Sequence, residues 1–179
     1  DGTTYTDFEP VHSYTSPGTY LISLYAENYC GTTEPVIQEI CIEPPLNPSF
    51  SLPSIEGCIP LALSPINNTD VSQSCDIPIY EWLINYTPEY CGTSDGSSFI
   101  NGTDSASSNP DIEFSNSGVY ELILRATNSC GTFESGPQQV IVKAPPLISL
   151  DPIDNFCGPT IISPNYTFDN CSPNNITFN

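Results

Sequence analysis

Cysteine is the residue type in this sequence whose number and spacing point most clearly to chemistry. The chain has eight cysteines, and none of them forms a Cys-x-x-Cys pair. Zinc and iron–sulfur sites usually draw ligands from such close spacing, so the pattern disfavours metal ligation. The even number and wide spacing favour disulfides, which persist in oxidising compartments. The sequence therefore predicts a disulfide-bonded protein that works outside the cytoplasm.

Residues that perform catalysis are scarce. Catalysis needs a nucleophile with a base, a metal, or paired carboxylates in a cleft. The one histidine, His12, aligns with Ile112 in the repeat described below, so we interpret it as a strand residue near the surface. Asp151 and Asp154 form a close acidic pair, but such pairs arise by chance in so acidic a chain. We therefore expect no enzyme activity.

Calcium is the best cofactor candidate, because hard cations bind several oxygen ligands. Four aspartates fall in predicted loops: Asp70, Asp76, Asp95 and Asp104. None of them sits in an Asp-x-Asp-x-Asp array, and solvated loop acids are the competing interpretation. The sequence therefore offers candidate ligands without fixing a metal site.

The formal net charge is −19, from 21 acidic and two basic residues, Arg125 and Lys143. Binding to nucleic acid or to anionic lipid needs Lys and Arg, so both partners are excluded. A uniformly acidic surface also keeps a protein soluble at high local concentration. No apolar run reaches the 18–20 residues of a membrane span, so we expect no direct membrane insertion.

The sequence repeats itself at a distance of 100 residues. The stretch 18–32 returns as 118–132, and the match begins at the first residue. A second match pairs 58–65 with 157–164, after which Cys75 corresponds to Cys171. Repetition on this scale indicates a module that is used in tandem.

The repeat divides the chain into the back part of one unit (1–44), a complete unit (45–144) and the front part of a third (145–179). The two joints hold Pro44-Pro45 and Pro145-Pro146. Paired prolines favour stiff, extended linkers. No signal peptide opens the chain, and its first residues match the middle of the later repeat, so we expect a fragment of a longer protein.

Within a unit the hydrophobic pattern is that of β-strands. The stretch 120–127 alternates with the period of two of a strand that buries one face. Further strands are expected over 61–66, 79–84 and 140–142, and no helical stripe exceeds two turns. About seven short strands in about 100 residues predict an all-β sandwich.

Two motifs of the complete unit resemble an immunoglobulin-like sandwich. Trp82, in Tyr80-x-Trp82, stands on the third strand, where such folds hold a core tryptophan. Tyr120, in Gly118-x-Tyr120, and its counterpart Tyr20 start the sixth strand, where a tyrosine folds back onto the preceding corner. The order of these motifs resembles the PKD (polycystic kidney disease) repeat over nearly the whole unit. The resemblance implies tandem immunoglobulin-like (PKD-like) β-sandwich domains, with these three aromatic residues in the core.

The chain departs from the standard PKD repeat after its tryptophan. Where that repeat has an acidic residue and a Phe-Gly-Asp-Gly turn, this chain has Leu83-Ile84-Asn85 and a longer cysteine-bearing loop. The Asn-x-Cys-Gly ending of the sixth strand, at 28–31 and 128–131, is similar to units of giant Bacteroidetes surface proteins. Among these proteins the chain resembles the SprB-type gliding-motility adhesins, which the type IX secretion system exports.

This resemblance implies a non-catalytic structural and adhesive segment of a long extracellular filament at the cell surface. Its expected partners are neighbouring repeats of the same chain, with surface polysaccharide or the motility and secretion machinery as further candidates. Two other interpretations stand beside it. One is an accessory spacer or carbohydrate-binding module of a secreted multidomain enzyme, and the other is a glycosylated eukaryotic ectodomain.

The sandwich topology that the resemblance implies places the cysteines of the complete unit at its two poles. Cys75 and Cys130 follow strands that end at one pole, whereas Cys58 and Cys91 fall at the other. We therefore predict Cys58–Cys91 and Cys75–Cys130 among three possible pairings, each adding about 2–4 kcal/mol. Cys41 receives no role, since Ile141 fills its place in the repeat. Partners outside the chain are expected for Cys30, Cys157 and Cys171.

Sugar attachment and sugar binding give the remaining site predictions. Five asparagines open Asn-x-Thr sequons, which arise by chance in an Asn- and Thr-rich bacterial chain and would be glycosylated in a secreted eukaryotic one: Asn67, Asn85, Asn101, Asn165 and Asn175. Ser105, in Asp104-Ser105-Ala106, is similar to an O-glycosylation acceptor of Bacteroidetes, although an ordinary polar loop explains it equally well. Tyr86 and Tyr90, expected on the loop after the third strand, are candidates for stacking on carbohydrate, and rim aromatics of this kind are often just packing.

Overall fold

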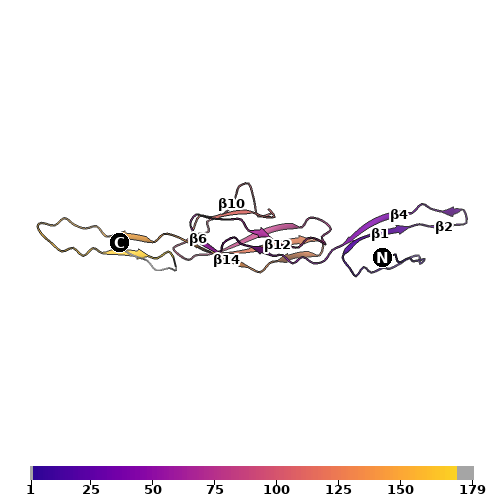
Figure 1. Cartoon of the computed structure of the whole chain (residues 1–179), viewed down its shortest axis with the longest axis horizontal. Coiled ribbons are helices and arrows are strands. Elements are labelled where there is room, and N and C mark those ends of the chain that lie inside the picture. The colour runs from indigo at the N-terminus through magenta and orange to yellow at the C-terminus, as the bar shows by residue number, and fades with distance from the viewer. Residues whose placement is uncertain (1, 173–179) are drawn as a thin grey trace.

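Figure 1 shows the chain drawn out along one axis, with its strands in three successive groups. The computed structural model describes residues 2–172, and in that range all regular structure is β, as predicted. We call 1–44 the first segment, 45–144 the middle segment and 145–179 the third segment. Every strand pairing stays inside one of these segments. Among the described residues there is no helix long and apolar enough to span a membrane.

The largest sheet lies in the middle segment and is organised around its longest strand, β12 (Gly118–Asn128). One edge of β12 pairs with β9 (Ile79–Thr87). The other edge of β12 pairs with two strands in succession. Its first half pairs with β14 (Gln138–Lys143), and its last residues pair with β13 (Gly131–Glu134). The strand β6 (Glu56–Cys58) adds to β14 in parallel, and all other pairs are antiparallel.

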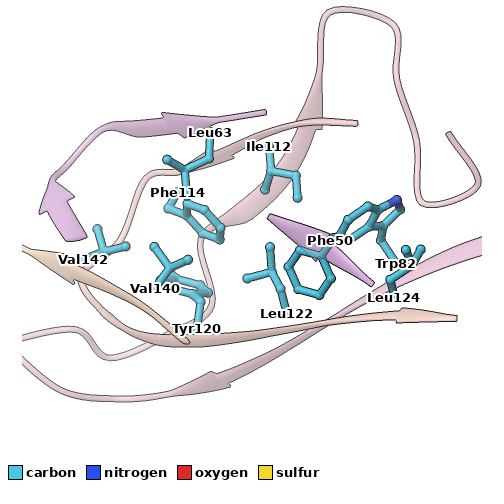
Figure 2. Close-up of a cluster of buried hydrophobic side chains, with 10 residues drawn as sticks. All are labelled: Phe50, Leu63, Trp82, Ile112, Phe114, Tyr120, Leu122, Leu124, Val140 and Val142. Carbon is cyan, nitrogen blue, oxygen red and sulfur yellow. The ribbon is translucent and has the colours of Figure 1, made fainter. Parts of the chain in front are cut away.

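A second layer of the middle segment comes from shorter strands. One sheet has the order β10 (Ser97–Ile100), β11 (Asp111–Phe114) and β7 (Leu61–Leu63), and all its pairs are antiparallel. The strands β5 (Phe50–Ser51) and β8 (Ile66–Asn67), which precede and follow β7 in the sequence, form a separate antiparallel pair. Figure 2 shows side chains from these strands facing those of β12 and β14.

The core of the middle segment follows the period of two that the sequence predicts for β12. Its side chains at 120, 122, 124 and 126 are completely buried, and those between them are partly exposed. They meet buried residues of both layers around Trp82 (Figure 2). The ten members of this cluster are Phe50, Leu63, Trp82, Ile112, Phe114, Tyr120, Leu122, Leu124, Val140 and Val142.

The first segment reproduces the last three strands of the middle segment, β12 to β14, but has no strand at 11–14 to match β11. β1 (Gly18–Leu24) pairs with β4 (Val36–Ile42), and the short hairpin β2 (Glu27–Asn28) with β3 (Gly31–Thr32) continues it. The register is also repeated at a distance of 100 residues: Gly18↔Ile42 and Tyr20↔Ile40 become Gly118↔Val142 and Tyr120↔Val140. The repeat in the sequence is therefore a repeat in strand pairing.

The corner tyrosines also repeat. The Tyr120 hydroxyl donates to the carbonyl of Asn116 at 2.8 Å, and the Tyr20 hydroxyl donates to that of Ser16 at 2.9 Å. Tyr120 is completely buried and also accepts from the Gly96 amide. Tyr20 is only half-buried, so it is at the margin rather than in a closed core.

The outer segments leave their apolar faces uncovered. In the third segment β15 (Leu147–Leu150) pairs with β16 (Tyr166–Asp169), as β5 pairs with β8 in the middle segment. Leu24 and Ile148 are each more than two-thirds exposed. Outside the middle segment, Cys171 is the single buried hydrophobic residue among those described. The described parts of these segments therefore hold strand pairs without a closed core.

Candidate functional site

A disulfide crosses each joint between segments, which makes the joints the candidate functional sites. Cys41, on β4 of the first segment, is bonded to Cys75 in the loop after β8 of the middle segment, with the two Cα atoms 5.8 Å apart. Cys91, just beyond β9 in the middle segment, is bonded to Cys171 of the third, with Cα atoms 5.0 Å apart. Both joints are thus covalently bridged in addition to the main chain.

These bonds correct the predicted pairings Cys58–Cys91 and Cys75–Cys130. Cys58 and Cys130 are exposed and unbonded in the described structure. The expectation that Cys171 needs a partner outside the chain is also wrong. The prediction confined partners to one unit, whereas each pole of the middle segment also receives a cysteine from the adjoining segment. Cys30 and Cys157 likewise remain exposed thiols.

The expected placement of the cysteines at two poles nevertheless agrees with the contacts. At the first joint the Cys75 amide donates to the Glu43 carboxylate, and the Cys130 thiol donates to the Glu43 carbonyl at 3.2 Å. At the second joint Cys58 lies opposite Lys143 in the strand register. Each pole therefore gathers three cysteines: Cys41, Cys75 and Cys130 at one, and Cys58, Cys91 and Cys171 at the other.

The repeat explains why the two disulfides are formed by cysteines at different positions of the unit. Cys75 and Cys171 are equivalent positions, and each bonds back to the segment before it. Cys41 lies opposite Thr19 in β4, while Ile141 occupies the same place opposite Val119 in β14. A cysteine is therefore missing from that strand at the second joint, and Cys91 replaces it. This gives Cys41 the role that the sequence left unassigned.

Glu43 organises the first joint, and sequence analysis missed it. Its side chain accepts hydrogen bonds from the Ser129 hydroxyl at 2.6 Å and amide at 2.8 Å, and from the Cys75 amide at 2.8 Å. Asn128 adds a bond from its side-chain amide to the Pro44 carbonyl at 2.9 Å. Donation from Ser129 first, and then from the Cys75 amide, lowers the pKa of the Glu43 carboxyl. The sequence signal that could have identified Glu43 is its position directly before the Pro44-Pro45 joint.

We expect Glu43→Gln to loosen this contact, because the carboxylate is the form that its three donors prefer. A carboxyl pKa below the ordinary 4.5 in the folded state contributes stability above about pH 4.5, which is lost as pH falls through the folded pKa. In an NMR pH titration the Ser129 and Cys75 amide shifts should move with a midpoint below 4.5, and Glu43→Gln should abolish that titration. The matched control is Glu39→Gln on exposed β4. A midpoint unaffected by Glu43→Gln would contradict the contact.

The second joint is held by other groups. The Ala144 amide donates to the Cys171 carbonyl at 3.2 Å, which connects the middle and third segments. Lys143, at the position of Glu43 in the repeat, turns back to Glu56 in its own segment at 2.9 Å. The Ile59 amide donates to the Lys143 carbonyl at 3.0 Å. Each joint therefore has its own disulfide, and the two joints differ in their polar contacts.

The four aspartates proposed as calcium ligands are spread over separate turns. Asp70, Asp95 and Asp104 each accept an amide two residues ahead, from Ser72, Ser97 and Ala106. The Ser72 amide and hydroxyl lower the pKa of the Asp70 carboxyl. Asp76 is exposed. Among the described residues no three His, Cys, Asp or Glu side chains are placed to hold a metal ion.

The candidate sugar sites occupy varied surroundings. Asn67 and Asn101 have side chains engaged with the Thr69 amide and with Asp111, respectively. Asn85 and Asn165 are exposed, and Asn175 lies outside the described residues. Ser105 is half-buried, and its carbonyl accepts the Trp82 amide at 2.7 Å.

The tyrosine pair proposed to bind carbohydrate is split by the structure. Tyr86 lies on β9 and not in a loop; its ring packs 5.0 Å from that of Tyr120, and its hydroxyl donates to the Ser117 carbonyl. Burial raises the pKa of the Tyr86 hydroxyl. Tyr90 is half-buried, beside Cys91, in left-handed backbone. Tyr86 is therefore a packing residue, because β9 continues past the predicted end of its strand.

His12 and the acidic pair do not form a site. The ring of His12 is half-buried and lies near two aromatic rings, with the Tyr5 hydroxyl 2.9 Å from its Nδ1. It lies outside any strand, contrary to the expectation. Asp151 and Asp154 are exposed in the third segment.

The chain matches no protein-family model, and no curated protein is significantly similar to it.

Proposed function

We propose that this chain is a non-catalytic structural and adhesive repeat segment of a long extracellular filament at the cell surface. We further propose that its units are immunoglobulin-like (PKD-like) sandwiches in tandem, of the type found in gliding-motility adhesins exported by type IX secretion. The observation that supports this most is the disulfide across each joint. A covalent bridge between successive units would keep them joined when a surface filament is pulled.

What the repeat retains also favours this function. The strand register, the corner tyrosine and the Asn-x-Cys-Gly turn return from the first segment to the middle one. In both turns the asparagine side chain accepts the cysteine amide two residues on. His12 does not return. Selection that preserves a shape and its joints suits a spacer or an adhesive arm better than an enzyme.

The charge distribution suits filaments that must stay apart. Arg125 pairs with Glu81 at 3.1 Å and Glu134 at 2.7 Å, and Lys143 pairs with Glu56. These are the only Lys and Arg residues in the sequence, so the other acidic side chains have no Lys or Arg of this chain to pair with. At physiological ionic strength such charges repel over about 8 Å. The surface therefore opposes lateral association of neighbouring chains.

The test is to locate the middle segment on cells that produce the protein. An antibody against 45–144 should label unfixed, intact cells, and brief surface proteolysis should remove the label. Deleting the repeats should reduce attachment of the cells to a surface. Label confined to the cell interior would overturn the proposal. Recovery in the medium, on one polypeptide with a catalytic domain, would favour the accessory module instead, and N-linked sugar on Asn85 would favour a eukaryotic ectodomain.

A further inference from the structure

The two disulfides create a short covalent route through the middle segment. A path that starts at Cys41 crosses to Cys75, follows the chain to Cys91 and crosses again to Cys171. The bonds bypass stretches with sequence separations of 34 and 80 residues. At about 3.5 Å per residue these correspond to about 120 Å and about 280 Å of chain. Only 75–91 remains in the route.

Most of this remaining stretch is a strand that is already extended. β9 has nine residues, Ile79–Thr87, and spans about 30 Å at about 3.3 Å per residue. The whole stretch 75–91 reaches at most about 55 Å when fully extended. Because β9 is already extended, only the residues on either side of it, 75–78 and 88–91, can lengthen the native route.

β9 is also held along its length by the rest of the middle segment. It pairs with β12 in an unbroken register from Ile79↔Thr127 to Thr87↔Val119. On its other edge the Trp82 amide donates to the Ser105 carbonyl at 2.7 Å. Trp82 also enters the core, 3% exposed. The strand is thus fixed in its extended state by hydrogen bonds on both sides.

We propose that β9 acts as a covalent tie between the first and third segments, so that tension passes through this strand and bypasses the other strands of the middle segment. Force applied beyond Cys41 and Cys171 reaches the middle segment at Cys75 and leaves it at Cys91. The strands of the middle segment outside 75–91 are then relieved of tension, and unfolding them releases no length. The proposal rests on the proposed function only in supposing that the chain bears tension, because the covalent route itself exists whatever the protein does.

The test is single-molecule force spectroscopy on the full chain, held by peptide tags at its two termini. The quantity measured is the final contour length after all unfolding, first with the disulfides intact and then after reduction and alkylation. We expect reduction to lengthen the chain by about 400 Å, the sum of the two bypassed stretches at about 3.5 Å per residue. Final contour length depends only on which cysteines are bonded, so the gain on reduction reports the disulfide pattern directly.

Matched variants assign the gain to each bond. Cys171→Ser should by itself release about 280 Å, and Cys30→Ser, which changes an exposed thiol, should release none. A gain of about 190 Å on reduction would indicate Cys58–Cys91 and Cys75–Cys130 and would overturn the tie, as would no gain at all. Surface labelling of cells tests the proposed function separately, since it does not depend on which cysteines are bonded.

Discussion

Replacing Trp82 by alanine is expected to destabilise the middle segment by about 3–5 kcal/mol. The side chain is 3% exposed and packs edge-on against Phe50, with ring centroids 4.9 Å apart. Its indole nitrogen donates to the Ser107 carbonyl at 3.0 Å, which fixes the loop that borders β9. Alanine would leave a cavity between the layers and an unpaired carbonyl. Since small domains are stable by about 5–15 kcal/mol, this loss is a large part of the total.

Urea unfolding of the full chain, followed by circular dichroism, measures this effect without depending on tryptophan fluorescence. Trp82→Phe is the matched control, because it keeps most of the apolar contact and removes only the indole hydrogen bond. We expect the phenylalanine variant to lose about 1–2 kcal/mol. Equal losses in the two variants, or a loss below about 1 kcal/mol for alanine, would show that Trp82 does not hold the layers together.

Gly92→Ala is expected to cost about 3 kcal/mol, although it adds only one methyl group. A Cβ atom at this position would overlap the carbonyl oxygen of Ser117 and come within 2.6 Å of the Tyr86 hydroxyl. These two groups are hydrogen-bonded to each other at 3.0 Å, so the methyl group would disrupt a contact between β9 and the corner before β12. Gly92 follows Cys91 directly, and its displacement would therefore disturb the second joint as well.

Gly136→Ala provides the comparison for this effect. Nothing lies within 4 Å of a Cβ atom at Gly136, so alanine there should be neutral or stabilise by about 0.4–1 kcal/mol through the unfolded state. Thermal unfolding of both variants under oxidising conditions gives the difference. Similar melting temperatures for Gly92→Ala and Gly136→Ala would refute the close approach of 92 to 117.

The strand that defines the middle segment was predictable because its pattern is purely local. In β12 the side chains at 120, 122, 124 and 126 are apolar and buried, so the period of two reads directly as one face turned inward. The repeat at a distance of 100 residues likewise predicted equivalent units, and in the structure β1 with β4 keeps the register of β12 with β14. Both inferences can be drawn from the sequence without knowing which segments are in contact.

The disulfide partners were not predictable in the same way. At each pole three cysteines come together, and the choice among them depends on the adjoining segment and not on the unit alone. The exchange of Cys41 for Ile141 between repeats shows this, because it moves the bridge at the second joint to Cys91. Glu43 escaped notice for a similar reason, since its donors at 75 and 129 are distant in sequence.

The end of β9 was misjudged for a different reason. Leu83-Ile84-Asn85 gives no clean alternation, so the sequence favoured a strand that ends at Ile84 and a loop that holds Tyr86. In the structure the pairing with β12 continues to Thr87. Tertiary pairing therefore outweighs local pattern here, as it commonly does for β-strands.

Non-reducing proteolysis with mass spectrometry of the linked peptides tests the bridged joints most directly. The alkylated, unreduced chain should yield one pair of peptides joined through Cys41 and Cys75, and another joined through Cys91 and Cys171. Cys58 and Cys130 should be recovered alkylated. Linked peptides of Cys58 with Cys91 and of Cys75 with Cys130 would contradict the bridges and confine each disulfide to one unit.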